Sequence, residues 1–385
     1  MVILFILTIF TVFLTLFLLK GQRRFKAFPE VGIETSGLDF KEVISIIVPM
    51  RNEEKNAARC LEGLLAQDYP EFEVIVVDDM STDGTTSILK GFESGHRNLR
   101  IVKGTERPEG WIGKSWALTQ GVEVSGGGLL LFIDADTHSR PEMLKSAVVY
   151  MKNNGLDMLS LFPYQEVISF WERVIQPLVF GVIFNAYPHE KVNDPACDVY
   201  LACGQFILIP REVYEAVGGH EAVKGKIVED FELAALVKRS GYRLGIAGGG
   251  NLISTRMYTC FSEIWEGWTK NVFPGINGDW LLFIMGLVMV SAWGILPPVI
   301  LAKSSVMLYR GGGVVEWLQL TEALWLVALN VFISWRGARR LDIPWPYAFS
   351  FPLGTAVFVA ILLTSAYRVV TGGGVVWKGR RYREI

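Results

Sequence analysis

Apolar residues concentrate at the two ends of the chain. Residues 2–19 contain no charged residue and no glycine, and three further apolar segments lie at about 280–302, 314–335 and 347–367. A helix needs close to 20 apolar residues to cross the roughly 30 Å hydrocarbon core of a bilayer. The pattern therefore predicts a transmembrane anchor over residues 1–20. It also predicts a membrane region over residues 276–385, with two or three transmembrane helices and a basic tail.

Basic residues follow the first apolar segment, at the last position of the anchor and at the start of a basic linker over residues 21–40. They are Lys20, Arg23, Arg24 and Lys26. Such residues gather on the cytosolic side of a membrane. No basic start or small-residue cleavage site marks the segment as a removed signal peptide. We therefore expect a multi-pass protein of the cytoplasmic membrane whose central domain faces the cytosol.

The number of later crossings stays open. Three crossings would leave the basic tail outside the cell, against the charge rule. The segment 314–335 carries Glu316 and Glu322, and the segment 280–302 contains Pro297 and Pro298. Either segment could be re-entrant or interfacial.

Residues 41–275 alternate between strand and helix patterns. Strand-like apolar runs occur at 43–49, 73–79, 99–103 and 129–136, the first of them rich in β-branched residues, and helical stretches separate them. After the first run, Ala57, Leu61, Leu64 and Leu65 fall on one helical face. This order predicts an α/β domain with a mainly parallel sheet covered on both faces.

Charged residues follow three of these predicted strands, and ligands of such sheets bind beyond the carboxyl ends of the strands. The clusters are Arg51-Asn52-Glu53, Asp78-Asp79 and Asp134-x-Asp136. Strand alternation would point Asp134 and Asp136 the same way, so they could share one hard cation. The alternative is helix capping, but Ser139 and Glu142 already supply a cap. Asp78 and Asp79 could accept hydrogen bonds from the N–H and hydroxyl groups of a nucleoside. Alternatively, they simply belong to a turn.

Two later clusters have competing interpretations. Gly113-Lys114-Ser115 is not a Walker loop, because Pro108 replaces the required glycine. Lys114 could still neutralise a diphosphate, or be a solvated surface lysine. Glu229 and Asp230 precede an amphipathic helix and could simply cap it.

The charge and cysteine content exclude some classes. A net charge of −2 and a pI near 6.2 leave no basic footprint for nucleic-acid binding. The four cysteines form no Cys-x-x-Cys pair and indicate free thiols.

Six motifs in order resemble the family-2 glycosyltransferases, membrane-attached enzymes with a GT-A nucleotide-sugar domain. They are "IIVPMRNEE", "VIVVDDMSTDGT", "GWIGKSWAL", "FIDADT", "ACGQFILIPREVYEAVGGH" and "VEDFELAALVKRSGYRLG". Within that family, "EIWEGWTKN" and "GGGVVWKGRRY" are similar to carotenoid glucosyltransferases and hopanoid-associated glycosyltransferases. The resemblance implies a GT-A domain over residues 41–275.

The resemblance also implies roles for individual residues. Asp230, with Glu229, matches the catalytic base, and Asp134 and Asp136 would hold Mg²⁺ or Mn²⁺. Trp265 and Trp268 would lie on the acceptor side with Gly204 and Gln205. The two tryptophans also predict a helix at the membrane interface. The implied nucleotide-sugar contacts are Pro49, Arg51, Glu53, Asp79, Lys114 and Asp134.

The implied reaction is inverting, metal-dependent transfer of one sugar, with glucose expected, from a UDP-sugar to a hydroxyl of a membrane lipid. A carotenoid, a hopanoid or a glycolipid precursor would be the acceptor. The chain lacks the Gln-x-x-Arg-Trp motif of the processive members, which favours a single addition. The alternatives are a polyprenyl-phosphate glycosyltransferase and a non-catalytic nucleotide-sugar-binding membrane scaffold.

Overall fold

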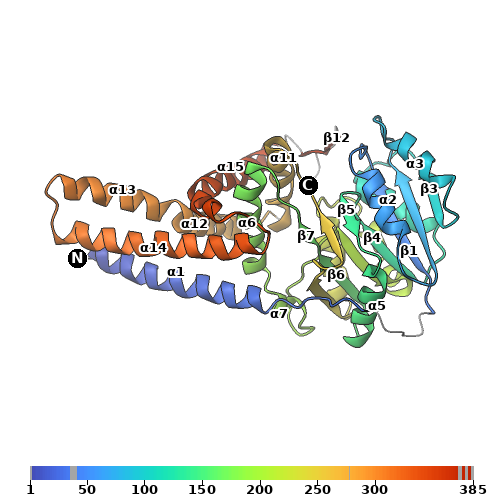
Figure 1. Ribbon diagram of the computed structural model, residues 1–385, viewed down its shortest axis with the longest axis horizontal. Helices are drawn as coiled ribbons and strands as arrows, with labels where there is room; N and C mark the ends of the chain where they lie inside the picture. Colours follow the sequence, from blue (N-terminus) through green and yellow to red (C-terminus); the bar gives the residue numbers. More distant parts are fainter. Residues whose placement is uncertain (1, 35–40, 277, 372–374, 378–379, 383–385) are drawn as a thin grey trace. The chain divides into compact units, whose positions relative to one another are not determined.

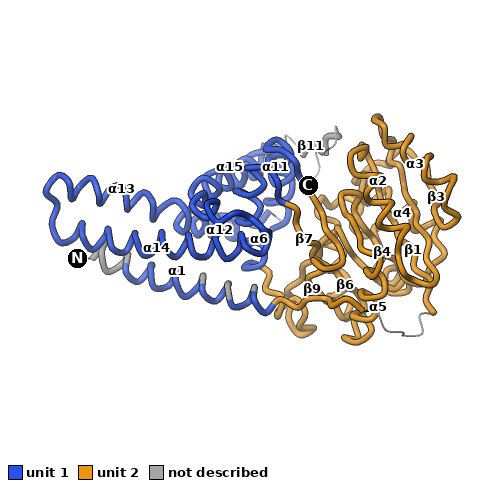
Figure 2. The backbone as a smooth tube through the Cα atoms, in the orientation of Figure 1, with its two compact units in different colours: residues 1–27, 167–186, 258–375 blue, residues 28–166, 187–257, 376–385 orange. Residues whose placement is uncertain are grey.

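The chain folds into two compact units. The computed structural model describes residues 2–34, 41–276, 278–371, 375–377 and 380–382. The sheet unit comprises residues 28–166, 187–257 and 376–385, and the helical unit comprises residues 1–27, 167–186 and 258–375 (Figure 2). Residues 167–186 and 258–275, which we expected in the soluble domain, thus group with the apolar helices.

The predicted α/β fold is confirmed. Within the described residues the main sheet has seven strands in the order β3-β2-β1-β4-β8-β6-β9 (Figure 1). Its strands are β1 (Ile44–Met50), β2 (Phe72–Asp78), β3 (Leu99–Lys103), β4 (Leu129–Ile133), β6 (Met158–Phe162), β8 (Phe206–Pro210) and β9 (Leu244–Gly248). The helices of the sheet unit are α2 (Ala57–Leu65), α3 (Thr85–Glu93), α4 (Gly113–Glu123), α5 (Met143–Asn153), α7 (His189–Val192), α8 (Arg211–Ala216), α9 (Gly219–Ala222) and α10 (Glu229–Arg239).

Most neighbouring strands run parallel, and β8 is the exception. β1 pairs in parallel with β2 and β4, whereas β8 is antiparallel to both β4 and β6. The register of the parallel strands places Met50 opposite Asp78. The charged residues that follow β1, β2 and β4 therefore reach the same edge of the sheet, as the pattern predicted.

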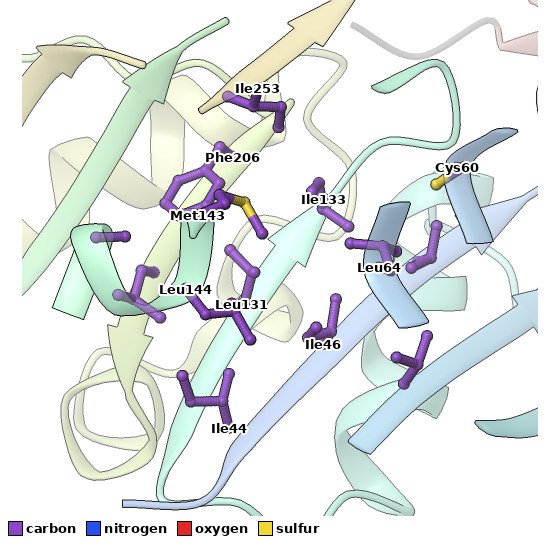
Figure 3. Packing of buried hydrophobic residues seen from close by; sticks show 14 of the residues in the cluster. Ile44, Ile46, Cys60, Leu64, Leu131, Ile133, Met143, Leu144, Phe206 and Ile253 are labelled. Atoms are coloured by element: carbon purple, nitrogen blue, oxygen red, sulfur yellow. The ribbon is translucent and has the colours of Figure 1, made fainter. Parts of the chain in front are cut away.

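Both faces of the sheet are buried, which explains the near-continuous apolar runs. Ile46 of β1 and Leu131 of β4 pack with α2 and α5 in one large core (Figure 3). The alternate residues Ile75 and Val77 of β2 pack against α4 on the other face. Gly121 of α4 allows this close approach, because a Cβ there would lie 2.5 Å from the Ile47 side chain.

A small second sheet lies beside the segment that contains Asp134 and Asp136. It has the order β5-β10-β7, with β5 (Thr137–Ser139), β7 (Tyr164–Gln165) and β10 (Ile253–Thr255). Thr255 donates a hydrogen bond from its hydroxyl to the carbonyl of Asp136 at 3.2 Å. The small sheet therefore fixes the backbone at the end of β4.

The residues after the first helix bind the free edge of β9. Val31 donates to the Gly248 carbonyl at 2.9 Å, and Gly248 donates to the Pro29 carbonyl at 2.7 Å. Val31 itself is buried in the main core. Covering an edge in this way prevents pairing with another chain.

The helical unit consists mainly of α-helices, several of them long and apolar. They are α1 (Val2–Lys26), α6 (Phe170–Ala186), α11 (Phe261–Asn271), α12 (Trp280–Gly294), α13 (Leu296–Tyr309), α14 (Val314–Arg339) and α15 (Phe351–Val370), with the 3-10 helices η1 (Pro274–Ile276) and η2 (Trp345–Ser350). The strands β11 (Val375–Trp377) and β12 (Arg380–Tyr382) form a two-stranded sheet within the described part of the C-terminal segment. α1 continues to Lys26, so the basic residues expected in the linker lie on the last turns of this helix.

Among the described residues, two helices are long and apolar enough to cross a membrane, over Val314–Arg339 and Trp345–Val370. The pair α12 and α13 would make a third as one span bent by 43°. The two prolines at 297 and 298 lie in the first turn of α13, where their missing N–H groups cost least. The bend thus falls on the 280–302 segment, and the two glutamates of 314–335 do not interrupt α14.

We predict that Ile46→Ala destabilises the sheet unit, whereas Ile33→Ala has little effect. Both changes delete the same atoms, but Ile46 is fully buried and Ile33 is 48% exposed. Cavity formation in a core costs about 2–5 kcal/mol, and a surface change stays within about 0.5 kcal/mol. Thermal unfolding in detergent should therefore show a melting temperature lower by several degrees for Ile46→Ala. Equal shifts for the two variants would contradict the assigned core.

Candidate active site

The loops after β1 and β2 are tied together by Arg51. Its Nη1 donates to the carbonyl oxygens of Asp79 at 2.6 Å and Met80 at 3.1 Å. Asn52 and Met80 have φ values of 53° and 55°, in the left-handed region that side chains disfavour. Such strained backbone gathers at functional sites. The two loops are therefore held in one defined arrangement.

The two acids after β2 have different environments. Asp78 accepts hydrogen bonds from the Ser81 N–H at 3.0 Å and from the Thr86 hydroxyl, so it shapes the loop before α3. Asp79 is buried at the same strand end. Its contact with the nucleotide sugar stays a prediction.

Pro49 and Glu53 also lie at this end of the sheet. Pro49 is the next-to-last residue of β1 and is half-buried. The Glu53 carboxylate accepts a hydrogen bond from the Asn56 amide at 2.8 Å, and the Glu53 backbone N–H donates to the Thr85 hydroxyl at 2.8 Å. Their roles toward a nucleotide sugar stay predictions.

The Asp134-x-Asp136 motif forms a turn directly after β4. The Thr137 N–H donates to the Asp134 carbonyl at 3.3 Å, so the strand does not continue through the motif as expected. Ala135 is buried while both aspartates are half-buried. Both aspartates thus keep part of their surface exposed, and a turn, not strand alternation, produces this arrangement.

Lys114 joins two of the acidic clusters. It lies in the first turn of α4, and its ammonium is 2.8 Å from Asp134 Oδ1 and 2.8 Å from Glu229 Oε1. The Glu229 side chain is only 7% exposed and that of Lys114 18%. The surface-lysine alternative is therefore wrong.

Asp230 is held by two backbone donors. The Gly204 N–H donates to Oδ2 at 2.7 Å, and the Phe231 N–H donates to Oδ1 at 2.8 Å. A Cβ at position 204 would lie 2.9 Å from the Lys114 nitrogen and 3.0 Å from Asp230 Oδ2. Only glycine therefore fits here without displacing the charged groups.

These side chains line one small cavity between α4, β4, β8, α9 and α10. Its polar lining comes from Lys114, Asp134, His220, Glu229 and Asp230, with the Gly204 backbone. The apolar walls are Leu118, Phe132, Ile133 and Ile207. The structure thus brings together residues that the sequence places on separate motifs.

Comparison with known proteins identifies the class of this site. The model of glycosyl transferase family 2 matches residues 45–218, which contain β1 to β8. Residues 45–218 form a family-2 glycosyltransferase domain. The matched segment includes Lys114, Asp134 and Gly204, whereas Glu229 and Asp230 lie beyond it.

Two curated relatives match almost the whole enzyme. The 4,4'-diaponeurosporenoate glycosyltransferase of Staphylococcus aureus strain USA300 is 28% identical over 387 residues and covers 97% of each chain. The protein of the same name from strain MRSA252 is 28% identical over 383 residues, also with 97% of each chain.

A solved structure shows the fold. The mannosyltransferase PcManGT from Pyrobaculum calidifontis, in complex with GDP-Man and Mn²⁺, superposes with a TM-score of 0.53. It is 18% identical and matches 95% of this chain and 97% of its own. The predicted GT-A fold of the enzyme is thereby confirmed.

Burial and charge shift the proton affinity of the site. Burial and the neighbouring Glu229 charge together raise the pKa of Asp230 to about 6, against the opposing effect of Lys114. Burial alone would lower the pKa of Lys114, but the charges of Asp134, Glu229 and Asp230 hold it well above its usual range. Lys114 therefore stays charged while Asp230 titrates near neutral pH.

The predicted metal site has oxygen ligands on only two side chains. No group of three or more His, Cys, Asp or Glu side chains among the described residues could hold an ion. Mg²⁺ commonly takes one or two carboxylates and completes its shell with substrate phosphates and water. Asp134 and Asp136 suit a metal of this kind, shared with a diphosphate, and do not form a complete protein cage.

The predicted acceptor residues differ in their surroundings. Gln205 is 4% exposed, and its amide donates to the Thr255 hydroxyl at 3.0 Å, so it supports the small sheet. Trp268 is buried in the core of the helical unit, where its indole donates to Gln176 at 2.8 Å. Trp265 is half-buried beside Phe261. The structure thus gives Gln205 and Trp268 packing roles, and an acceptor role stays a prediction.

One residue of the cavity was not singled out from the sequence. His220 belongs to the quoted "VGGH" stretch but has no ligand spacing with another histidine or cysteine. Only the position of α9 beside α10 and α4 brings it to the cavity.

The proton affinity of Asp230 gives a testable pH dependence. A raised carboxyl pKa keeps the proton on Asp230 at low pH, so kcat/KM for sugar transfer should fall below a midpoint near pH 6. Replacing Glu229 with Gln removes the adjacent negative charge, which should move this midpoint to lower pH. The measurement is a pH profile of kcat/KM for the wild type and for Glu229→Gln.

The control is Glu62→Gln, the same change at an exposed position of α2, which should leave the midpoint unmoved. A wild-type midpoint near pH 4, or no shift in Glu229→Gln, would contradict the assignment to Asp230.

Proposed function

We propose that the enzyme transfers one sugar from a UDP-sugar to a hydroxyl of a membrane lipid, with inversion at the anomeric carbon. Glucose is the sugar we expect, and a carotenoid, a hopanoid or a glycolipid precursor is the acceptor. The observation that carries the proposal is the shared cavity, where Lys114 links Asp134 to Glu229 beside Asp230. The groups proposed to bind the donor and to accept the proton are thus adjacent.

Asp230 is the proposed general base. An alcohol is a weak nucleophile near neutral pH, and a base that takes its proton accelerates attack by about 10²- to 10⁴-fold. The two N–H donors from Gly204 and Phe231 fix the direction of its carboxylate. Its pKa near 6 leaves it ionised at neutral pH but still able to accept a proton.

Lys114, Asp134 and Asp136 form the proposed diphosphate end of the site. Asp134 and Asp136 would hold Mg²⁺ or Mn²⁺, which when bound acts as a Lewis acid on the leaving group. Lys114 adds a positive charge, because the neighbouring carboxylates keep its amine protonated. Asp79, with Arg51 and Glu53, would bind the nucleoside.

The acceptor proposal rests on the two whole-length relatives. Their name gives diaponeurosporenoate as the acceptor, which is a long apolar molecule of the carotenoid type. Such a molecule partitions into the bilayer, whereas a nucleotide sugar stays in water. A transferase of the membrane surface brings the two together.

The helical unit supports a cytosolic orientation. α1 and α14 lie side by side and run in the same direction, because Thr8 contacts Glu322 and Thr15 contacts Trp325 further along both helices (Figure 1). Their basic ends therefore coincide. These ends carry Lys20, Arg23, Arg24 and Lys26 on α1, and Arg336, Arg339 and Arg340 at the end of α14. By the positive-inside rule this end faces the cytosol.

A second acceptor chemistry follows from the same name, since an "-oate" is a carboxylate. A carboxylate acceptor has no proton to lose at neutral pH, so it would not need Asp230 as a base. The product would then be an ester, which mild alkali cleaves, and not an alkali-stable glycoside.

Two substitutions test the proposed roles. Asp230→Asn should lower transfer by about 10²- to 10⁴-fold because the base is lost, while donor binding persists. Asp136→Asn should weaken donor binding and abolish the stimulation of binding by Mn²⁺. The assay uses membranes with labelled UDP-glucose and UDP-galactose and mass spectrometry of the labelled lipid, with titration calorimetry for donor binding.

Asp68→Asn is the matched control, because Asp68 pairs with Lys145 on the exposed surface. Full transfer by both Asp230→Asn and Asp136→Asn would refute the mechanism. Retained transfer in Asp230→Asn alone, with an alkali-labile product, would favour the carboxylate acceptor.

A further inference from the structure

The turn between α8 and α9 folds tightly over Tyr214. Gly218 and Gly219 both have positive φ values, 83° and 53°. A Cβ at position 219 would lie 2.5 Å from the Tyr214 ring. The two glycines therefore let the chain reverse against this ring and place His220 directly beside it.

Tyr214 makes two hydrogen bonds to His220. The His220 backbone N–H donates to the Tyr214 hydroxyl oxygen at 3.0 Å, and the hydroxyl lies 2.9 Å from the imidazole Nδ1. The hydroxyl oxygen accepts the first bond, so its own proton is available to donate to Nδ1. When the hydroxyl donates this proton to Nδ1, the ring proton lies on Nε2.

The imidazole borders the active-site cavity. Its ring stands edge-on to Phe132 at 4.7 Å between centroids, and both residues line the cavity with the charged groups. Glu229 and Lys114 are the charged side chains that act on it. Because Nδ1 is engaged by Tyr214, Nε2–H is the polar group that the ring can offer to this cavity.

His220 is neutral in this environment. Burial, together with the charge of Lys114 and against the opposing effect of Glu229, lowers its pKa to about 4. A neutral imidazole can supply one N–H donor without adding a charge. The proton chemistry of the cavity therefore stays with Asp230.

We propose that His220 is a positioning residue of the transfer reaction, whose Nε2–H, fixed by the Tyr214 hydroxyl, orients the Glu229 carboxylate beside Asp230. The inference rests on the proposed role of Asp230 as the base. It adds a residue that acts through Glu229. Orientation of Glu229 matters because this carboxylate also holds Lys114.

Two amide substitutions separate the two ring nitrogens. In His220→Gln the side-chain amide reaches the position of Nε2 and can supply its N–H. In His220→Asn the shorter amide reaches only the Nδ1 side. We expect kcat to fall by about 10- to 100-fold in His220→Asn, the usual effect of losing a hydrogen bond to a charged group. His220→Gln should restore most of this loss, and the KM for the UDP-sugar should change little in either variant.

Tyr214→Phe provides an independent test. It keeps the ring that packs against Gly219 but removes the hydroxyl that fixes the tautomer. We expect a kcat between those of the wild type and His220→Asn. Melting temperatures of the three variants should be measured in parallel, because a merely structural role would make activity follow stability.

The outcomes distinguish this inference from the proposed function. If Asp230→Asn is inactive while His220→Asn keeps the wild-type kcat, the role of His220 is refuted and the base stands. Equal activity of the Gln and Asn variants at equal melting temperature also refutes it. If Asp230→Asn itself remains active, the proposed function fails first.

Discussion

The site depends on the ammonium of Lys114 lying between Asp134 and Glu229. Carboxylates from β4 and α10 would repel one another in a partly buried cavity, and each would lose hydration without a partner. One lysine at the start of α4 offsets both costs. It thereby fixes the distance between the proposed diphosphate end and the proposed base, Asp230. Gly204 is needed to keep this arrangement, because a side chain at this position would collide with Lys114 and Asp230.

Much of the sheet and the location of the site could be predicted from the sequence. The runs at 43–49 and 73–79 have the apolar pattern of strands buried on both faces, and acids after parallel strands must meet at one edge. The environment of each acid could not be predicted. Asp78 is used by its own loop, whereas Asp134 reaches Lys114, and nothing in "DD" or "DAD" distinguishes these outcomes.

Contacts between distant segments escaped prediction for a topological reason. The antiparallel strand β8 lies between β4 and β6, so the loop before it brings Gly204 to Asp230. No periodic pattern announces such an insertion. His220 and Gln205 were likewise within quoted motifs, but only the fold shows that one borders the cavity and the other is buried in a hydrogen-bond network. For Trp268, a position near the apolar segments suggested an interface, yet packing buried it.

The central claim is that Lys114 compensates the acids and so sets the proton affinity of the base. The most direct measurement is the pH profile of kcat/KM for Lys114→Met beside Lys114→Arg. Loss of the positive charge should move the midpoint of the acid limb above about 6, the value expected for Asp230 with Lys114 present. Lys114→Arg, which keeps the charge, should leave the midpoint near the wild-type value. An unchanged midpoint in Lys114→Met would contradict the account.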